Sequence, residues 1–210
     1  VLPCSMPELC KPLNDMIEEL AQSGKKTAKE LYGARGFASH HNVDIWRMST
    51  PVGGSAAWSF WYCSGAWFTR HLFEYYEYTG DMDFLREKAY PVILESAKFC
   101  VDILTEDKDG NLIACPSTSP ENLFIDKDGE EVAVSQTTTM TMSIIKDNLQ
   151  NALNCADILG DNDPFIDEIK DVLPRLLPFK TGKDGRLLEW YKEEKENEPK
   201  HRHVSHLYGL

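Results

Sequence analysis

The sequence predicts an all-α fold that forms part of a toroid of helical hairpins. Helical hydrophobic periodicity recurs along the chain, and long, largely apolar helices alternate with amphipathic ones. Tight turns join the two helices of a pair, whereas much longer loops join one pair to the next. Because antiparallel hairpins place their short turns at one end, we expect the long loops to share the opposite face.

The first predicted helices flank the first long loop. The stretch SMPE at 5–8 is typical of a capping box with a proline in the first turn, and apolar positions follow at helical spacing. Gly24 is expected to stop this helix, and a short helix should follow at about 27–32. Over 55–79, apolar and aromatic residues cover nearly the whole circumference of a helix, which predicts burial on more than one side.

Two helix pairs follow, each joined by a tight turn. The stretch TGD at 79–81 supplies a glycine C-cap and an aspartate N-cap. The next helix, about 82–104, has a one-sided apolar stripe, and Pro91 should kink or restart it. The pattern recurs with a long helix over 136–159, a GDND turn and a shorter amphipathic helix over 164–177.

The length limits how much of a toroid the chain can build. A closed ring of six hairpins needs roughly twice 210 residues. We therefore expect residues 1–210 to form a single domain that is a fragment of such a ring. An open fragment would expose apolar helix faces and could self-associate through them.

Composition excludes several classes of partner. The net charge of -12 repels phosphate backbones and anionic lipids, so we expect no nucleic acid and no membrane partner. The uncharged run 48–69 is long enough to span a bilayer, but it contains Pro51, Gly53, Gly54 and four serines. The run is therefore interpreted as a buried loop and helix.

Cysteine usage bears on the compartment. The six cysteines show no close-set metal spacing, and three lie on apolar helix faces, which favours free buried thiols. Free thiols and the lack of a signal peptide in this chain favour a cytoplasmic location. The chain does not begin with Met, so the localisation stays open.

The first long loop, over 33–54, suits a sugar. His41, Asn42 and Asp44 supply donors and acceptors beside a tryptophan, and a sugar has polar hydroxyls and an apolar C–H face. The structural alternative is an ion pair between Asp44 and Arg47, with histidines satisfying buried loop backbone.

The third long loop, over 178–210, contains HRHVSHLYG. Its three histidines suggest zinc, but the segment lacks the glutamate of the H-E-x-x-H motif and any helix signature. Sugar-binding groups or buried hydrogen-bonded histidines are favoured, and no metal or cofactor is expected. The histidines in question are His201, His203 and His206.

The second long loop holds CPSTSPENLF at 115–124. Pro116 and Pro120 limit where its single acid, Glu121, can point. A glycosidase needs such an acid to protonate the leaving oxygen, and an inverting one needs a base on the opposite face. A solvated surface glutamate is the alternative. From the residues alone, Asp44 or Glu189 would be the second carboxylate.

Six motifs carry a family resemblance. From about residue 33 to 210, the chain resembles the catalytic domain of glycoside hydrolase family 95, the inverting 1,2-α-L-fucosidases, which also include some α-L-galactosidases. The resemblance implies an (α/α)6 barrel that acts on an oligosaccharide or glycan. The motifs, in register, are HHNVDIWR, WSFWYCSGAW, TGDMDFLREKAYPV, PSTSPEN, GKDGRLLEW and HRHVSHLYGL.

The resemblance also implies roles for individual residues. The glutamate of its Pro-Ser-x-Ser-Pro-Glu-Asn motif is the general acid, which corresponds to Glu121. The Arg-His of its His-Arg-His motif contacts the sugar, which corresponds to Arg202 and His203. Residues expected to line the pocket are His41, Asn42, Asp44, Trp58 and Trp61.

One part of the family pattern is missing. Water is activated in the family by an Asn-x-Asn motif and an aspartate, which should fall before residue 1 and beyond residue 210. This argues against Asp44 or Glu189 as the base. The resemblance thus implies a fragment of an exo-α-L-fucosidase, inactive alone, acting on terminal α-1,2-linked L-fucose with inversion. The alternatives are an α-L-galactosidase and a non-catalytic carbohydrate-binding toroid.

Overall fold

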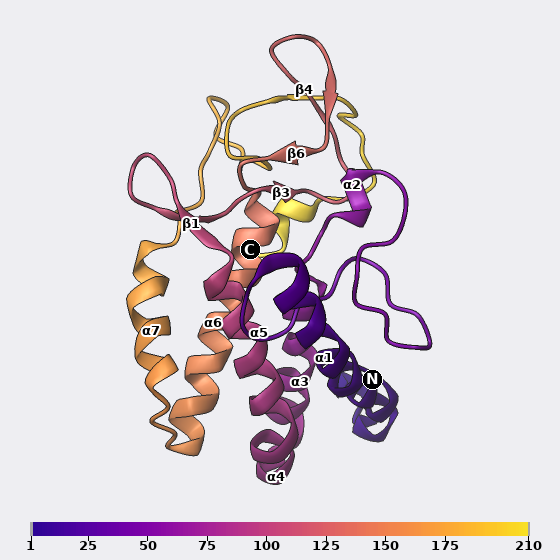
Figure 1. Cartoon of the computed structure of the whole chain (residues 1–210), viewed down its shortest axis with the longest axis vertical. Helices are drawn as coiled ribbons and strands as arrows, with labels where there is room; N and C mark the ends of the chain where they lie inside the picture. The colour runs from indigo at the N-terminus through magenta and orange to yellow at the C-terminus, as the bar shows by residue number, and fades with distance from the viewer. Residues whose placement is uncertain (1, 210) are drawn as a thin grey trace.

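The computed structural model describes residues 2–209. Helices stand side by side at one end, and loops with short strands cover the other end (Figure 1). The second and third long loops lie at this second end, as the hairpin pattern predicts, whereas the first long loop runs back along the first long helix, where Arg47 pairs with Glu19. The long helices are α1 (Lys11–Tyr32), α3 (Ser64–Thr79), α5 (Tyr90–Asp102), α6 (Thr139–Leu159) and α7 (Pro164–Val172).

Helix α1 differs from the prediction at both ends. The capping box does not form, because Met6 is the N-cap of a 3-10 turn, η2 (Pro7–Cys10), and makes no side-chain cap bond. The helix also runs through Gly24 to Gly33, whose φ of 62° ends it. A Cβ on Gly24 would lie 2.7 Å from the carbonyl oxygen of Ala38. Gly24 therefore allows the first loop to cross close to the helix.

The predicted helix over 55–79 is divided in two. A short helix, α2 (Ala56–Ser59), precedes α3, and the residues between them leave helical geometry. Cys63 forms a parallel bridge with Ser39, and Ser64 donates to the carbonyl of His40. The break thus attaches the first loop to the start of α3.

The helix predicted over 82–104 restarts, as expected, near Pro91. It consists of α4 (Met82–Phe84), a π-helical turn η3 (Leu85–Ala89) and α5. The N–H of Tyr90 donates to the carbonyl of Leu85, five residues back, and Pro91 then lies in the first turn of α5.

The second hairpin is shorter than predicted. Thr138 caps α6 by accepting a bond from the N–H of Thr141. Helix α7 is capped by Asp163 but ends at Val172 rather than 177, where a 3-10 turn, η4 (Leu173–Arg175), begins. Pro174 in this turn has no N–H to continue the α-helical bonds.

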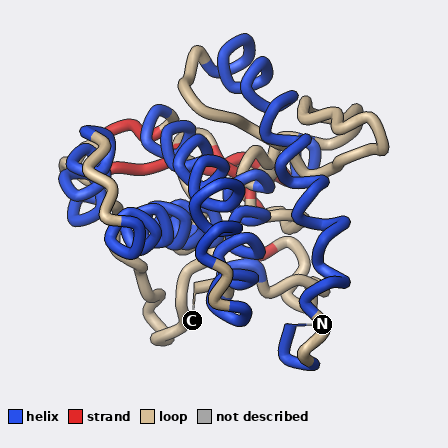
Figure 2. The backbone as a smooth tube through the Cα atoms, turned by 90° about the horizontal axis from the view of Figure 1, so that it is seen from below, coloured by secondary structure: helices blue, strands red, loops and turns tan. Residues whose placement is uncertain are grey.

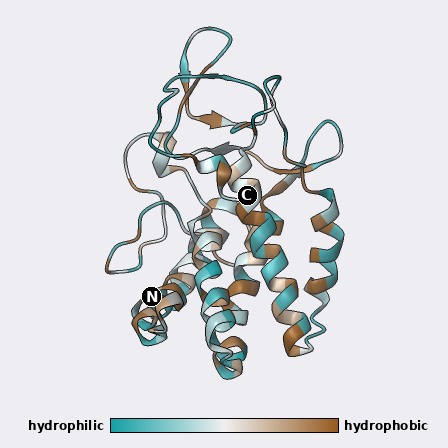
Figure 3. Ribbon diagram, turned by 180° about the vertical axis from the view of Figure 1, so that it is seen from behind, coloured by the Kyte–Doolittle hydropathy of each residue, from teal (hydrophilic) through white to brown (hydrophobic). Residues whose placement is uncertain are grey.

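The core lies between α3, α5 and α6, which pack on one another, with α1 against α3 and α7 against α6. Leu72, Ile93 and Leu149 are each fully buried there. The helices carry hydrophobic residues alternating with hydrophilic ones, whereas the loops above them are largely hydrophilic (Figure 3).

Short strands in the long loops correct the all-α prediction. Seen from the helix end, the strands lie behind the helices (Figure 2). Two-residue strands give little hydrophobic periodicity, so pattern reasoning misses them. The antiparallel pairings are β1 (Leu104–Glu106) with β2 (Leu112–Ala114), β3 (Ser117–Thr118) with β6 (Val134–Ser135), and β4 (Phe124–Ile125) with both β5 (Glu131–Val132) and β7 (Lys195–Glu196).

The uncharged run 48–69 folds as a loop followed by α2 and the start of α3, as predicted. Within residues 2–209, no helix combines the length and apolar character that crossing a bilayer requires.

Candidate active site

The loop that carries Glu121 is anchored to two helices. Its Cys115–Pro116 and Pro120–Glu121 peptide bonds are cis. The phenol of Tyr62, just before α3, donates to the carbonyl of Pro116 at 3.0 Å. Ser117 donates to Thr141 in the first turn of α6 at 2.8 Å. These bonds place the loop over the ends of the buried helices.

The third loop fastens the same segment from the other side. The hydroxyl of Ser205 donates to the carbonyl of Pro120 at 2.6 Å. The N–H of Asn197 donates to the carbonyl of Leu123 at 3.1 Å, beside the pairing of β4 with β7. The chain on both sides of Glu121 is therefore hydrogen-bonded to the 195–207 segment.

Glu121 and Arg202 form an ion pair. The Arg202 Nη2 donates to Glu121 Oε2, and the two side chains are 26% (Glu121) and 67% (Arg202) exposed. The structure thus brings together the predicted acid and the predicted sugar-contacting arginine from two separate loops. When it is protonated, a solvent-accessible carboxyl group at this position can meet a sugar and donate a proton to its leaving oxygen.

Glu189 lies directly under the acid loop. Its side chain is 9% exposed. Ser119 donates to Oε1 at 2.6 Å, and the amide of Asn122 donates to Oε2 at 3.1 Å. The Nδ1 of His206 lies 3.7 Å from Oε2. Since donors of the acid loop occupy both carboxylate oxygens, Glu189 is held as a loop support and not as a base aimed at water.

These supporting residues were not predicted from the sequence. Ser119 and Asn122 flank the acid within PSTSPEN, so their hydrogen-bonding side chains were a visible signal. Their common acceptor, Glu189, is 70 residues from Ser119, and spacing alone gives no sign of that pairing.

A cleft of about 540 Å³ opens beside this loop. The Nδ1 of His201 donates to the carboxylate of Glu198 at 3.1 Å, and the His201 ring lies edge-on to His203 with centroids 5.4 Å apart. Neither Glu121 nor Arg202 is among the described residues that line the cleft. The lining that bears on the site comprises Asn122, Glu189, His201, His203 and His206.

The histidines of the third loop do not converge as a metal site would require. Within the described range 2–209, no three His, Cys, Asp or Glu side chains are grouped so that they could hold a metal ion. His201 is instead paired with Glu198, and His206 faces Glu189.

Asp44 stabilises a turn in the first loop. Its Oδ1 accepts from the backbone N–H groups of Trp46 at 3.0 Å and Met48 at 2.9 Å. Arg47 forms an ion pair with Glu19 at 2.8 Å. The predicted alternative, in which Arg47 pairs with Asp44, is therefore wrong. Between residues 2 and 209, no hydrogen bond or ion pair joins Asp44 to Glu121.

The paired histidines of the first loop differ in environment. His40 is fully buried, and its Nδ1 and Nε2 lie 2.7 Å from the carbonyl of Ser49 and 2.6 Å from the phenol of Tyr32. Burial lowers the pKa of His40, outweighing the bond to Ser49. His41 is half-buried, and its Nδ1 is buried without a partner among residues 2–209, whereas Asn42 is exposed. Of the two, Asn42 therefore offers its polar group to a ligand.

The two tryptophans of the WSFWYCSGAW motif also differ. Trp61 is 5% exposed, and its ring packs edge-on to Trp67 with centroids 5.7 Å apart. Trp58 is half-buried beside Gly54, at which a Cβ would lie 2.9 Å from the indole Nε1. Trp58 is thus the more open of the two rings, and Trp61 belongs to the hydrophobic core.

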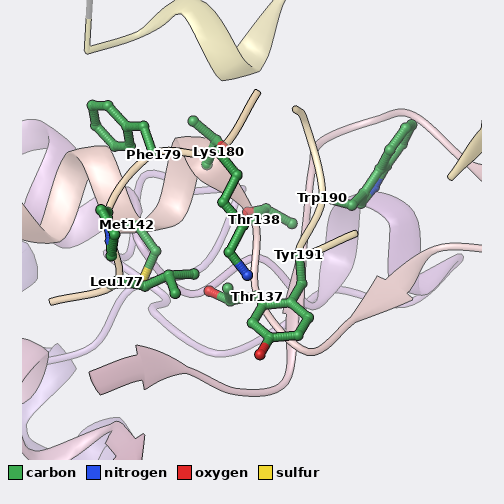
Figure 4. A pocket seen from close by; sticks show the side chains of 10 residues that line it. Thr137, Thr138, Met142, Leu177, Phe179, Lys180, Trp190 and Tyr191 are labelled. Atoms are coloured by element: carbon green, nitrogen blue, oxygen red, sulfur yellow. The ribbon is translucent and has the colours of Figure 1, made fainter. Parts of the chain in front are cut away.

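A second cavity lies between the start of α6, residues 177–180 and residues 190–191, and is too small for a sugar. Its volume is about 10 Å³, room for at most one water molecule. Lys180 extends over the ring of Tyr191, with Nζ 3.9 Å from the centroid (Figure 4). The neighbouring Thr137 Oγ1 is buried without a partner, which suits such a water.

These hairpins and their loop-borne acid define an α/α-hairpin protein with a candidate glycosidase site. Among solved structures, a putative kojibiose phosphorylase from human microbiome shares the fold, with a TM-score of 0.54 and 12% identity, over 82% of this chain and 24% of that chain. The chain belongs to the glycosyl hydrolase family 95 catalytic domain, whose profile matches residues 1–210.

Two curated relatives match nearly the whole chain. Alpha-L-fucosidase 2 of Arabidopsis thaliana is 40% identical over 210 residues, which cover 100% of this chain and 25% of the relative. Probable alpha-fucosidase A of Aspergillus niger is 29% identical over 209 residues, which cover 96% of this chain and 26% of the relative. The chain therefore spans about a quarter of the length of these relatives.

Proposed function

We propose that the chain is one part of the (α/α)6-barrel catalytic domain of an exo-α-L-fucosidase that removes terminal α-1,2-linked L-fucose with inversion. The observation that carries the proposal is the pairing of Glu121 with Arg202. Two of the six family motifs supply these residues, and the fold brings them into contact. Membership of family 95 and the names of both relatives support the fucosidase assignment.

In the proposed mechanism, Glu121 is the general acid. The glycosidic bond breaks as its proton passes to the leaving oxygen, and a water molecule adds to the anomeric carbon from the opposite face. The base that takes the proton of that water belongs to another segment of the longer enzyme. Arg202 must share or release Glu121 Oε2 when the leaving oxygen approaches, and its guanidinium is then free to bind sugar hydroxyls.

The exposed apolar side chains support the partial barrel. Leu31 at the end of α1 is 55% exposed, and Ile158 near the end of α6 is 40% exposed. Side chains of this kind favour burial, and further hairpins of the ring would cover them. Without those hairpins the same faces would promote self-association.

Product stereochemistry tests the proposal. The longer enzyme should convert 2′-fucosyllactose to lactose and L-fucose, and proton NMR should show the β anomer first. The 210-residue chain alone should give no turnover. Initial release of the α anomer, or turnover by the isolated chain, would contradict the proposed mechanism.

Sugar preference needs a separate comparison. L-Galactose carries a hydroxymethyl group where L-fucose carries a methyl group, and residues outside this chain can contact that position. The kcat/KM values of the longer enzyme for matched α-L-fucosides and α-L-galactosides decide between the two. If both sugars bind in calorimetry without any turnover by the longer protein, a non-catalytic carbohydrate-binding role replaces the enzyme.

A further inference from the structure

We propose that Glu189 is a positioning residue for the catalytic acid, and that its buried carboxylate fixes the backbone on both sides of Glu121. This inference rests on the proposed function, in which Glu121 protonates the leaving oxygen. Glu189 itself does not touch the substrate in this account. It acts through the two acid-loop residues that it binds.

Glu189 binds the acid loop on both sides of the acid. Ser119, two residues before Glu121, donates to Oε1 at 2.6 Å, and Asn122, one residue after it, donates to Oε2 at 3.1 Å. Ser119 is 0% exposed and Asn122 is 4% exposed. Hydrogen bonds to a charged acceptor are stronger than neutral ones, and these two are partly buried, so they restrict the short segment between them.

Glu189 is itself fixed to a helix. Its carbonyl accepts from the N–H of Thr139, the first residue of α6, at 3.0 Å. The next residue, Trp190, forms an antiparallel bridge with Thr138. The N–H of Tyr191 donates to the carbonyl of Thr137 at 3.1 Å. These bonds fix Glu189 to the N-terminal end of α6, and the Glu189 side chain in turn holds the acid loop.

The donors around Glu189 need an acceptor at this position. Asn122 must present its NH₂ to Glu189, because its Oδ1 accepts from the N–H of Leu123 at 2.9 Å. An alanine at position 189 would leave the Asn122 amide and the Ser119 hydroxyl without this acceptor and free the loop. A glutamine would instead keep both contacts, because its carbonyl oxygen can accept from Asn122 while its NH₂ donates to the Ser119 hydroxyl.

The test compares two substrates in the longer enzyme. Hydrolysis of 2′-fucosyllactose needs a proton on the leaving oxygen, whereas α-L-fucosyl fluoride releases a stable anion with little need for an acid. Misplacing the acid by about 1 Å should lower kcat for 2′-fucosyllactose about 10- to 100-fold in Glu189→Ala. The same variant should hydrolyse the fluoride within about threefold of wild type, because the acid adds little there.

An exchange of the carboxylate for an amide provides the rescue. In Glu189→Gln the amide oxygen can accept from Asn122 and the NH₂ can donate to the Ser119 hydroxyl, so both contacts to the acid loop are kept. This variant should therefore recover most of the activity on 2′-fucosyllactose that Glu189→Ala loses. Ser119→Ala removes one bond only and should give a smaller loss with the same substrate selectivity, which keeps the test open if Glu189→Ala fails to fold. Glu131→Gln, an exposed carboxylate on β5, is the matched control.

Each outcome decides the inference. Selective loss on 2′-fucosyllactose, with rescue by the exchange and an unchanged Tm, supports the positioning role. Equal losses on both substrates, no loss on either, or no rescue would overturn it. A wild-type enzyme that hydrolyses neither substrate would instead contradict the proposed function, so the two failures can be told apart.

Discussion

Arg202 donates to the carboxylate of Glu121, although 81 residues separate them in the chain. The contact joins the second long loop to the third, and the bond from Ser205 to the Pro120 carbonyl reinforces it. The site is therefore built between two loops, and each loop depends on the other for its position. Substitutions in the third loop should consequently act on the chemistry at Glu121.

Replacing Arg202 tests this dependence. Arg202→Ala removes a charged donor to Glu121 and a proposed donor to the sugar, so kcat/KM of the longer enzyme should fall about 10- to 100-fold, as expected for a hydrogen bond to a charged group. Arg202→Lys should recover only part of this loss, because lysine lacks the planar fork of donors. The control is Arg175→Ala, which removes an exposed ion pair between Arg175, in η4, and Glu106. Equal activity of Arg202→Ala and wild type would refute the role.

Gly24 should be intolerant of a side chain. Gly→Ala in an exposed helix usually stabilises it by about 1 kcal/mol. Here the added Cβ would lie 2.7 Å from the carbonyl oxygen of Ala38 and 2.9 Å from Phe37 Cδ2. Gly24→Ala should therefore lower the free energy of unfolding by about 1–3 kcal/mol through overpacking. Urea denaturation measures this, and Gln22→Ala, on the exposed side of α1, is the control.

His40 should make the stability of the protein depend on pH. Burial lowers the pKa of His40 in the folded state, whereas in the unfolded chain it is about 6.5. Well above about pH 6.5, the His40 side chain is neutral in both the folded and the unfolded state, and the full stability is present. Below that pH the unfolded state takes up a proton first, so the free energy of unfolding should fall by up to about 1.4 kcal/mol per pH unit until the folded pKa is reached.

Thermal unfolding between pH 7.5 and 5.5 measures the His40 effect. His40→Gln keeps a donor for the Ser49 carbonyl and an acceptor for the Tyr32 phenol but cannot titrate. The variant should show a flatter dependence of Tm on pH than wild type over this range. If the two dependences are parallel, His40 is not the group responsible.

The fold was predictable where the signal is local. Turns and hydrophobic periodicity correctly predicted the long helices, the restart at Pro91 and a common end for the second and third long loops, whereas the first long loop runs along α1. The prediction failed where tertiary contacts decide. Gly24 stays helical because Ala38 and Phe37 pack on it, and the helix over 55–79 breaks where Cys63 bridges to Ser39. Neither contact leaves a mark on the neighbouring sequence.

The candidate site shows the same division. PSTSPEN and HRHVSHLYGL identified Glu121 and Arg202 through a family resemblance, and the fold brings these two residues into contact. The hydrogen bonds by which Glu189 holds Ser119 and Asn122 of the acid loop were missed, because they join side chains 70 and 67 positions apart in the chain. Asp44, selected for its chemistry, stabilises a turn through its Oδ1, and its role in sugar binding stays a prediction.

The decisive measurement is the activity of Glu121→Gln in the longer enzyme. Glutamine keeps the shape and can still accept from Arg202, but it cannot donate the catalytic proton. We expect kcat for 2′-fucosyllactose to fall by about 10²- to 10⁴-fold, the usual contribution of a general acid, with Tm unchanged. Undiminished activity of Glu121→Gln on this substrate would contradict the assignment of Glu121 as the acid.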